Sequence, residues 1–567
     1  MIKRNLYFLV GLVLTASLLW PLFVSPLFTH HDDVQIIRLF EMDKCIKDGQ
    51  IPCRWVPDLG GLYGYPLFNY YAPLPYYFGE IFNWLTNNLI TSVKIMFISA
   101  FVGSFVFMYL LARKFFGQLG ASLAAIFYAF APYHAVDFYV RGAMGEMWGL
   151  MFFPALFWAL VRLSEQTNII NVLLSGILIA TLITAHNLSA AIFLPIGFLF
   201  VIVLYIRKRN RRFLLGSFFS LTLGILLSAF YLIPMVFEKN LVHVETTTIG
   251  YFSYTEHFKG LRKLILDRSW GYGGSVREVP GGEKDTLPYQ IGWVHLFGLL
   301  LSLYVVRRIW KNDPWIAKLI VFSLSIILLS IFLINPRSEF VWKMIEPMKY
   351  LQFPWRFLMI IIFFISFISG SIFLLIKDTG AKRWWIGLVV AVVAANFFYF
   401  RPEKFINISQ DELLRGSSWE RQIKRSIFDY LPKSAKEPPA ELASSRYQIL
   451  TGDSRVYDFA QGTNWIKFKT ETNSHTIIRL SQYYFPQWKI TVDGKEIVFD
   501  YENNNLGLMT IILGKGNHDI QARLYNTTIR TVANFITVVG FGLTAILFLV
   551  HFKGVRKWIL YYRRRIN

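Results

Sequence analysis

Cysteine and charged residues are both scarce in this 567-residue chain, which has two cysteines and only 17% charged residues. Two cysteines are too few for a disulfide-rich scaffold, and they lack the cysteine and histidine companions of a zinc site. The low charge accompanies 54% hydrophobic and 17% aromatic residues. This composition excludes a soluble protein and is typical of a chain that crosses a membrane several times.

Acidic residues are also few, 36 against 58 lysines and arginines, and the net charge is +22. Such an excess can indicate nucleic-acid binding. Here, however, the basic residues occur in short runs between apolar segments, as the positive-inside rule expects of cytoplasmic loops. We therefore expect no nucleic-acid partner.

Long apolar segments dominate the chain, and twelve of them are candidates to cross a hydrocarbon core of roughly 30 Å. Residues 169–206 are too many for one crossing, so they should turn at His186 and Asn187. The twelve segments are 6–24, 91–112, 118–133, 146–163, 169–186, 188–206, 213–236, 291–306, 315–334, 356–376, 384–400 and 532–550.

The basic runs predict the orientation. With the amino terminus inside, all of them fall on the cytoplasmic side, which predicts a multi-pass plasma-membrane protein with both termini cytoplasmic. The first apolar run exceeds the usual roughly 7 to 15 residues of a signal peptide, so we interpret it as a retained helix. Four long segments are then external: 25–90, 237–290, 335–355 and 401–531.

The last external segment is long enough to form a domain between a membrane part (1–400) and a final helix with a basic tail (532–567). It has helical spacing at first. From about residue 440 it shows alternating runs and a tight Asp493-Gly494 turn, which predict a β-sandwich or jelly roll. A lid that packs on the membrane part and a substrate-binding domain are equally compatible with this pattern.

Both cysteines, Cys45 and Cys53, fall in the first external segment. A disulfide between them would close a short loop and contribute roughly 2 to 3 kcal/mol. Two free thiols are equally compatible with the sequence, because no geometry is visible in it.

Polar residues at the outer ends of the apolar segments are the candidates for a site. Asp32 and Asp33 follow the first segment, where they either do chemistry or cap a helix. If the stretch is helical, Glu41 lies on the face of Asp33 and Arg38 neighbours Glu41.

Further polar residues occur in the later turns. Asp137, Arg141 and Glu146 share one turn, as a functional group or as a structural Arg141–Glu146 pair. His186 and Asn187 either line a cavity or satisfy their turn. Arg356 either binds a lipid phosphate or anchors the interface.

Five stretches carry a resemblance to known proteins. Residues 31–77, YVRGAMGEMWGL (139–150), AHNLSA (185–190), QFPWRF (352–357) and YYFPQWKITVDGK (483–495) resemble the membrane proteins grouped as "6-pyruvoyl-tetrahydropterin synthase-related membrane domain", near the YfhO-like family. That family commonly has Pro-Gly-Trp where this chain has Pro486-Gln487-Trp488. More broadly, the chain resembles GT-C glycosyltransferases: a polytopic α-helical membrane protein of about twelve spans with an external β-rich domain.

The resemblance implies an enzyme that transfers a sugar from a polyprenyl-phosphate-linked donor to a cell-envelope glycan, lipid or protein. It implies Asp33 as general base, with Asp32 as the alternative and Glu41 or Glu146 assisting. A divalent cation, Mg²⁺ or Mn²⁺, held by Asp33 and Glu146 stays open. The expected substrate-binding residues are Arg38, Asp137, Arg141, Glu146, His186, Asn187 and Arg356.

Two other classes of function are compatible with the sequence. One is a transporter or flippase of lipid-linked sugars, although no internal repeat is visible. The other is a non-catalytic membrane scaffold that displays its β-domain.

Overall fold

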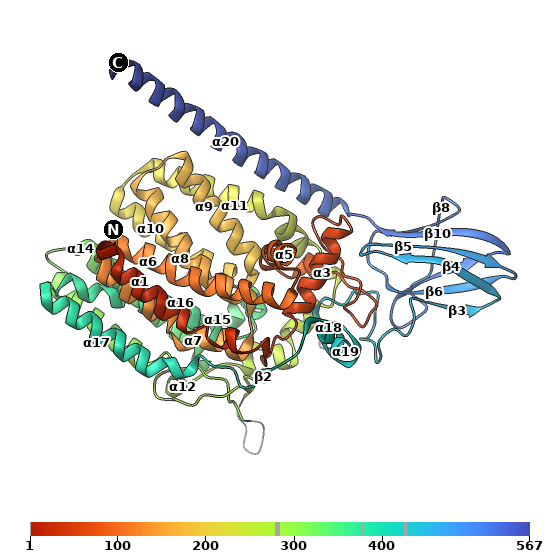
Figure 1. Ribbon diagram of the computed structural model, residues 1–567, viewed down its shortest axis with the longest axis horizontal. Coiled ribbons are helices and arrows are strands. Elements are labelled where there is room, and N and C mark those ends of the chain that lie inside the picture. Colours follow the sequence, from red (N-terminus) through yellow and green to blue (C-terminus); the bar gives the residue numbers. More distant parts are fainter. Residues whose placement is uncertain (1, 278–283, 377, 425–427, 567) are drawn as a thin grey trace.

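The computed structural model describes residues 2–277, 284–376, 378–424 and 428–566. A bundle of helices is joined to a β-rich C-terminal domain (Figure 1). The predicted fold class, a polytopic helical protein with a β-rich domain near its C-terminus, is confirmed. The start of α1 (Ile2–Ser17) and the end of α20 (Thr528–Ile566) both lie on the side away from the β-strands (Figure 1).

The predicted count of twelve spans is not confirmed. Over the described residues, eight helical segments are long and apolar enough to cross a membrane. Two predicted segments fall on one helix, α6 (Leu89–Ala129), which is broken where Gly117 leaves the helical conformation (φ 69°, ψ −165°). Others are short: α9 (Ile169–Ala185) and α13 (Trp293–Ile309) have 17 residues each. At about 1.5 Å per residue, such helices reach roughly 25 Å, less than the hydrocarbon thickness.

Two helices form the centre of the bundle. These are α8 (Met144–Glu165) and α16 (Leu358–Ser369), and most of their side chains are buried. Phe153 of α8 stacks on Phe193 with ring centroids 3.8 Å apart and contacts Phe363 of α16 at 4.3 Å. By contrast, α20 packs mainly on α11 and is largely exposed (Figure 1). The remaining long helices are α10 (Asn187–Lys208), α11 (Arg211–Phe237), α14 (Pro314–Ile334) and α17 (Asp378–Asn396).

Short helices fill the segments between the long ones. Helix α2 (Pro21–Val24) precedes the first long segment, which contains α3 (Gln35–Lys47), α4 (Leu67–Tyr70) and α5 (Leu74–Thr86). Later ones are α7 (Pro132–Ala135), α12 (Leu261–Ile265), α15 (Glu339–Met344), α18 (Gln410–Leu413) and α19 (Gly416–Lys424). Strand β1 (Leu27–Phe28) pairs with β2 (Phe405–Ile406), which joins the first segment to the start of the C-terminal one.

The C-terminal domain is a sandwich of two antiparallel sheets. One has the strand order β4-β5-β10-β7-β8 and the other β3-β6-β9. Apolar residues of both sheets share one core, as the alternating pattern predicts. The predicted turn joins β7 to β8, with Asp493 and Gly494 at φ 52° and 78°. The strands are β3 (Tyr447–Thr451), β4 (Ser454–Gln461), β5 (Trp465–Thr472), β6 (Thr476–Tyr483), β7 (Trp488–Val492), β8 (Lys495–Ile497), β9 (Leu508–Leu513) and β10 (Gly516–Leu524).

The sandwich is fixed to the first long segment. Trp55 of that segment is buried in the sandwich core against Phe485 and Trp488. The backbone N–H of Tyr483 donates to the carbonyl of Tyr63 at 3.0 Å. A disulfide joins Cys45 to Cys53, which settles the question that the sequence left open. The first segment is therefore held between the bundle and the sandwich.

Candidate functional site

A cavity of about 710 Å³ lies where the four long segments that were predicted to be external come together. All four segments predicted to be external contribute to its wall, together with the turns after α7 and α9. Seven of the ten predicted site residues line it: Asp32, Arg38, Arg141, Glu146, His186, Asn187 and Arg356. The structure thus gathers residues that lie more than 300 positions apart in the chain.

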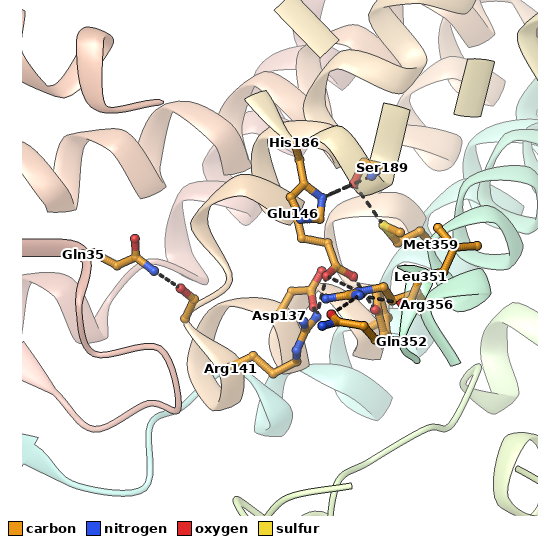
Figure 2. Close-up of polar contacts among 12 residues, drawn as sticks. Gln35, Asp137, Arg141, Glu146, His186, Ser189, Leu351, Gln352, Arg356 and Met359 are labelled. Atoms are coloured by element: carbon orange, nitrogen blue, oxygen red, sulfur yellow. Dashed lines mark hydrogen bonds and ion pairs between the residues drawn. The ribbon is translucent and has the colours of Figure 1, made fainter. Parts of the chain in front are cut away.

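Glu146 is the centre of one half of the cavity (Figure 2). Its side chain is 1% exposed and accepts a hydrogen bond from Arg141 Nη1 at 2.8 Å. Tyr133 Oη donates to the same carboxylate at 2.6 Å, and Arg356 Nε does so at 3.4 Å. Two guanidinium groups therefore meet at one buried carboxylate. We name Arg141, Glu146 and Arg356 the arginine cluster.

Asp137 is fully buried next to this cluster and forms an ion pair with Arg141. It is not among the residues that line the cavity. Burial and the nearby Glu146 raise the pKa of Asp137 well above its usual range. Among the groups that line the cavity here, Arg141 and Arg356 face the single carboxylate of Glu146. The arginine cluster then carries net positive charge on the cavity wall.

Arg356 is held in place by the motif that precedes it. Its Nη1 donates to the Leu351 carbonyl at 2.6 Å and to Gln352 Oε1 at 3.1 Å (Figure 2). Gln352 has a left-handed backbone, φ 62°, and its Nε2 donates to the Thr247 carbonyl at 3.1 Å. Such a conformation is costly for a residue other than glycine and is maintained by surrounding contacts. The side chain of Gln352 thus fastens Arg356 to the second long segment.

Two glycines of α8 bring the turn between α9 and α10 close to the cavity. A Cβ on Gly149 would lie 2.5 Å from Ser189 Oγ, and one on Gly145 would lie 3.0 Å from His186 Cδ2. Small residues one helical turn apart allow such close packing of helices in membranes. His186 lines the cavity and is also the N-cap of α10, where its Nδ1 accepts from the Ser189 N–H at 3.2 Å.

Asp32 is attached to the turn that carries Arg141. Its backbone N–H donates to the Arg141 carbonyl at 2.8 Å, and Gln35 Nε2 donates to the Gly142 carbonyl at 2.9 Å. Gly142 has φ 64°, and a Cβ there would lie 2.4 Å from His30 Nδ1, so this close approach requires glycine. The half-buried Asp32 interacts electrostatically with both Arg141 and Arg38.

The predicted helical relation between Asp33 and Glu41 is wrong. Helix α3 begins at Gln35 after Val34 as its N-cap, so both aspartates lie in the preceding turn and neither caps the helix. Asp33 is not among the residues that line the cavity. Glu41 is fully buried in α3 beside Asp58, and burial and that carboxyl raise the pKa of Glu41 well above its usual range.

Tyrosines and a further aspartate form the other half of the cavity. The Arg38 guanidinium lies over the Tyr71 ring at 4.1 Å, and Tyr430 stacks on Tyr70 with centroids 5.7 Å apart. Asp429 accepts a hydrogen bond from Thr246 Oγ1 at 3.2 Å. Sequence reasoning missed Asp429 and Tyr430, because no motif sets them apart in their segment. We name Arg38, Tyr71, Asp429 and Tyr430 the tyrosine wall.

The two predicted metal ligands, Asp33 and Glu146, do not both line this cavity. Among the residues that the structure describes, no group of three or more His, Cys, Asp or Glu side chains could hold a metal ion. Glu146 already accepts hydrogen bonds from three donors, and its predicted co-ligand Asp33 is not part of the cavity wall. Two arginines supply positive charge beside Glu146.

The comparisons with known proteins cover parts of the chain. Residues 68–267 match the family model described as "6-pyruvoyl-tetrahydropterin synthase related domain; membrane protein", which confirms the predicted resemblance over that range. An uncharacterized protein of Lactococcus lactis subsp. cremoris (strain MG1363) is 26% identical over 208 residues, which are 35% of this chain and 34% of that protein. The cryo-EM structure of arabinofuranosyltransferase AftD from mycobacteria is similar with a TM-score of 0.45 and 12% identity, over 70% of this chain and 27% of that one. The chain therefore matches only about a third or less of the length of either protein.

Proposed function

We propose that this protein is a membrane glycosyltransferase that moves a sugar from a polyprenyl-phosphate-linked donor to an acceptor hydroxyl. The observation that carries the proposal is that Asp32 lines the same cavity as the arginine cluster and the tyrosine wall, with its backbone N–H bonded to the Arg141 carbonyl at 2.8 Å. Its charge acts on Arg141 in the arginine cluster and on Arg38 in the tyrosine wall. A base located there can reach an acceptor on one side while a phosphate leaves on the other.

The arginine cluster supplies the phosphate side. Arginine binds phosphate oxygens through charge-assisted hydrogen bonds, often two at once. Apolar residues at the ends of α10 and α11, Leu188, Ala191, Met235 and Val236, line the same cavity. They offer a dry surface to the first isoprene units of a lipid carrier, whose remainder would lie in the membrane.

The reaction needs one proton transfer. The acceptor oxygen attacks the anomeric carbon, the bond from that carbon to the phosphate oxygen breaks, and the lipid phosphate leaves with the bonding electrons. Asp32 takes the hydroxyl proton of the acceptor. Arg141 and Arg356 stabilise the charge that develops on the departing phosphate.

The test compares two adjacent aspartates. Purified protein in nanodiscs is given a panel of radiolabelled polyprenyl-phosphate monosaccharides, and release of polyprenyl phosphate is measured. Asp32→Asn should lower the rate by roughly 10² to 10⁴. Asp33→Asn, which makes the same chemical change one residue away, should stay within a few-fold of the unaltered protein. An inactive Asp33→Asn of unchanged thermal stability would return the role of base to Asp33.

The cavity should face the outside of the plasma membrane, where a cell-envelope acceptor is available. This orientation rests on the basic runs between the apolar segments. A reporter fused after Arg212 should behave as cytoplasmic, and one inserted near Asp453 as external. A cytoplasmic signal at Asp453 would contradict transfer to an envelope acceptor.

A further inference from the structure

The C-terminal domain contributes side chains to the cavity as well as packing on it. Asp429 and Tyr430 belong to a 3₁₀ turn that precedes the sandwich, Phe428–Tyr430. Both residues line the cavity, which otherwise consists of bundle helices and their connections. The domain is therefore part of the site, although no residue of the sandwich strands is among those that line the cavity.

This turn is held firmly at its position. The His243 N–H donates to the Leu431 carbonyl at 2.9 Å, and the Lys433 N–H donates to the Leu241 carbonyl at 2.9 Å. These main-chain bonds form a short antiparallel bridge directly after Asp429. The Thr246 hydroxyl then orients the Asp429 carboxylate at 3.2 Å. A carboxylate fixed in this way can select a ligand by geometry.

The side chains of the tyrosine wall are complementary to a sugar. A carboxylate accepts hydrogen bonds from hydroxyl groups, and the tyrosines that line the cavity offer an apolar ring and a hydrogen-bonding hydroxyl to a sugar. The charges of Arg38 and Asp429 offset each other, so this half favours neither an anion nor a cation. Burial raises the pKa of Asp429 to about 6, and the group is still ionised at neutral pH.

We propose that the tyrosine wall is the acceptor subsite, that it binds a neutral carbohydrate, and that Asp429 accepts a hydrogen bond from one of its hydroxyls. This inference rests on the proposed glycosyl transfer. It assigns the acceptor to the class of neutral glycans rather than to lipids or proteins. Asp429 acts as a binding residue, and Asp32 remains the base.

The kinetic test separates the acceptor from the donor. Donor hydrolysis, which is transfer to water, is measured in nanodiscs alongside transfer to neutral gluco-, manno-, galacto- and rhamno-oligosaccharides. Asp429→Asn should raise the acceptor KM at least about tenfold, because a site built for a hydroxyl loses a charged partner. The rate of donor hydrolysis and the donor KM should stay within about twofold, since the arginine cluster is intact.

Two further variants keep this test interpretable. Asp458→Asn alters an exposed aspartate of the same domain, which pairs with Lys469 at 3.1 Å, and should leave all constants unchanged. Thr246→Val removes only the bond that orients Asp429 and should raise the acceptor KM by a smaller factor. A parallel loss of donor hydrolysis in Asp429→Asn would overturn the acceptor assignment.

A binding measurement makes the inference independent of turnover. Saturation-transfer NMR with the methyl glycosides of glucose, mannose, galactose and rhamnose should detect contact with the unaltered protein and lose it in Asp429→Asn. Absence of saturation transfer to all four methyl glycosides would overturn the assignment of the acceptor subsite. Sugar contact without any hydrolysis of the donors would instead refute the proposed glycosyl transfer and retain a carbohydrate site.

Discussion

Helix α8 carries a glutamate at each end, and the two should respond very differently to the same substitution. Glu146, in the first turn, is 1% exposed and bonded by Arg141, Arg356 and Tyr133. Glu165, the last residue, is 42% exposed and pairs with Lys114 at 2.6 Å. Breaking a buried ion pair costs roughly 3 to 5 kcal/mol, because the partner charge stays buried and uncompensated. A surface pair contributes at most about 1 kcal/mol.

The assay is thermal unfolding of the purified full chain in detergent, followed by the loss of soluble monomer. Glu146→Gln should lower the midpoint strongly, whereas Glu165→Gln should shift it little. High salt should reduce only the effect at Glu165, since screening acts on exposed charges. Similar shifts in the two variants would refute the description of Glu146 as the buried centre of the site.

A second readout addresses function. Glu146 competes with any incoming phosphate for the two arginines, so its removal leaves two cations facing the cavity. Farnesyl phosphate should therefore raise the midpoint of Glu146→Gln by more than it raises that of the unaltered protein. An equal rise in both would show that the phosphate binds away from these arginines.

Other predictions follow from particular backbone and side-chain positions. In the same unfolding assay, Gly149→Ala should destabilise the fold by about 1 to 3 kcal/mol, because its Cβ would lie 2.5 Å from Ser189 Oγ. Gly387→Ala is the control and should be neutral or slightly stabilising, because a Cβ there would meet no atom within 4 Å. Gln487→Gly should raise the unfolding free energy by about 1 kcal/mol, since Gln487 has φ 82°, and a lower value would contradict backbone strain there. Burial raises the pKa of Asp429 to about 6 against about 4 in the unfolded chain, so the folded state binds more protons between these values. The contribution of Asp429 to stability should therefore fall as the pH rises from 4 to 6, and an identical pH profile in Asp429→Asn would refute this.

Local patterns in the sequence predicted the class of the fold and many of its elements. Apolar runs and basic loops locate the helices, because a hydrocarbon core admits only segments that satisfy their own backbone. Alternating residues and the Asp493-Gly494 turn similarly predicted the strands after residue 440 and the β7–β8 hairpin. The predicted number of spans was not confirmed, because Gly117 joins two apolar runs in one broken helix and two helices are only 17 residues long.

The sequence also indicated which polar residues to consider, since charges at the ends of apolar segments are costly and need partners. Asp32, Arg141, Glu146 and Arg356 were all identified in this way and line one cavity. The sequence could not decide which of the adjacent residues Asp32 and Asp33 lines the cavity. Both residues lie in the turn before α3, yet only Asp32 is among the residues that line the cavity, and spacing along the chain does not reveal which of two adjacent side chains faces it.

Only the tertiary structure brought Asp429 and Tyr430 to the same cavity as Asp32. Nearly 400 residues separate Asp32 from Asp429 and Tyr430 in the chain. Their common place in the cavity depends on the anchoring of the sandwich through Trp55 and on the short bridge at residues 241–243. A sequence specifies such an arrangement only through the sum of many packing contacts, none of which has a local signature. Composition and periodicity therefore determined that this is a membrane protein with a β-domain, whereas long-range packing decided which side chains form its site.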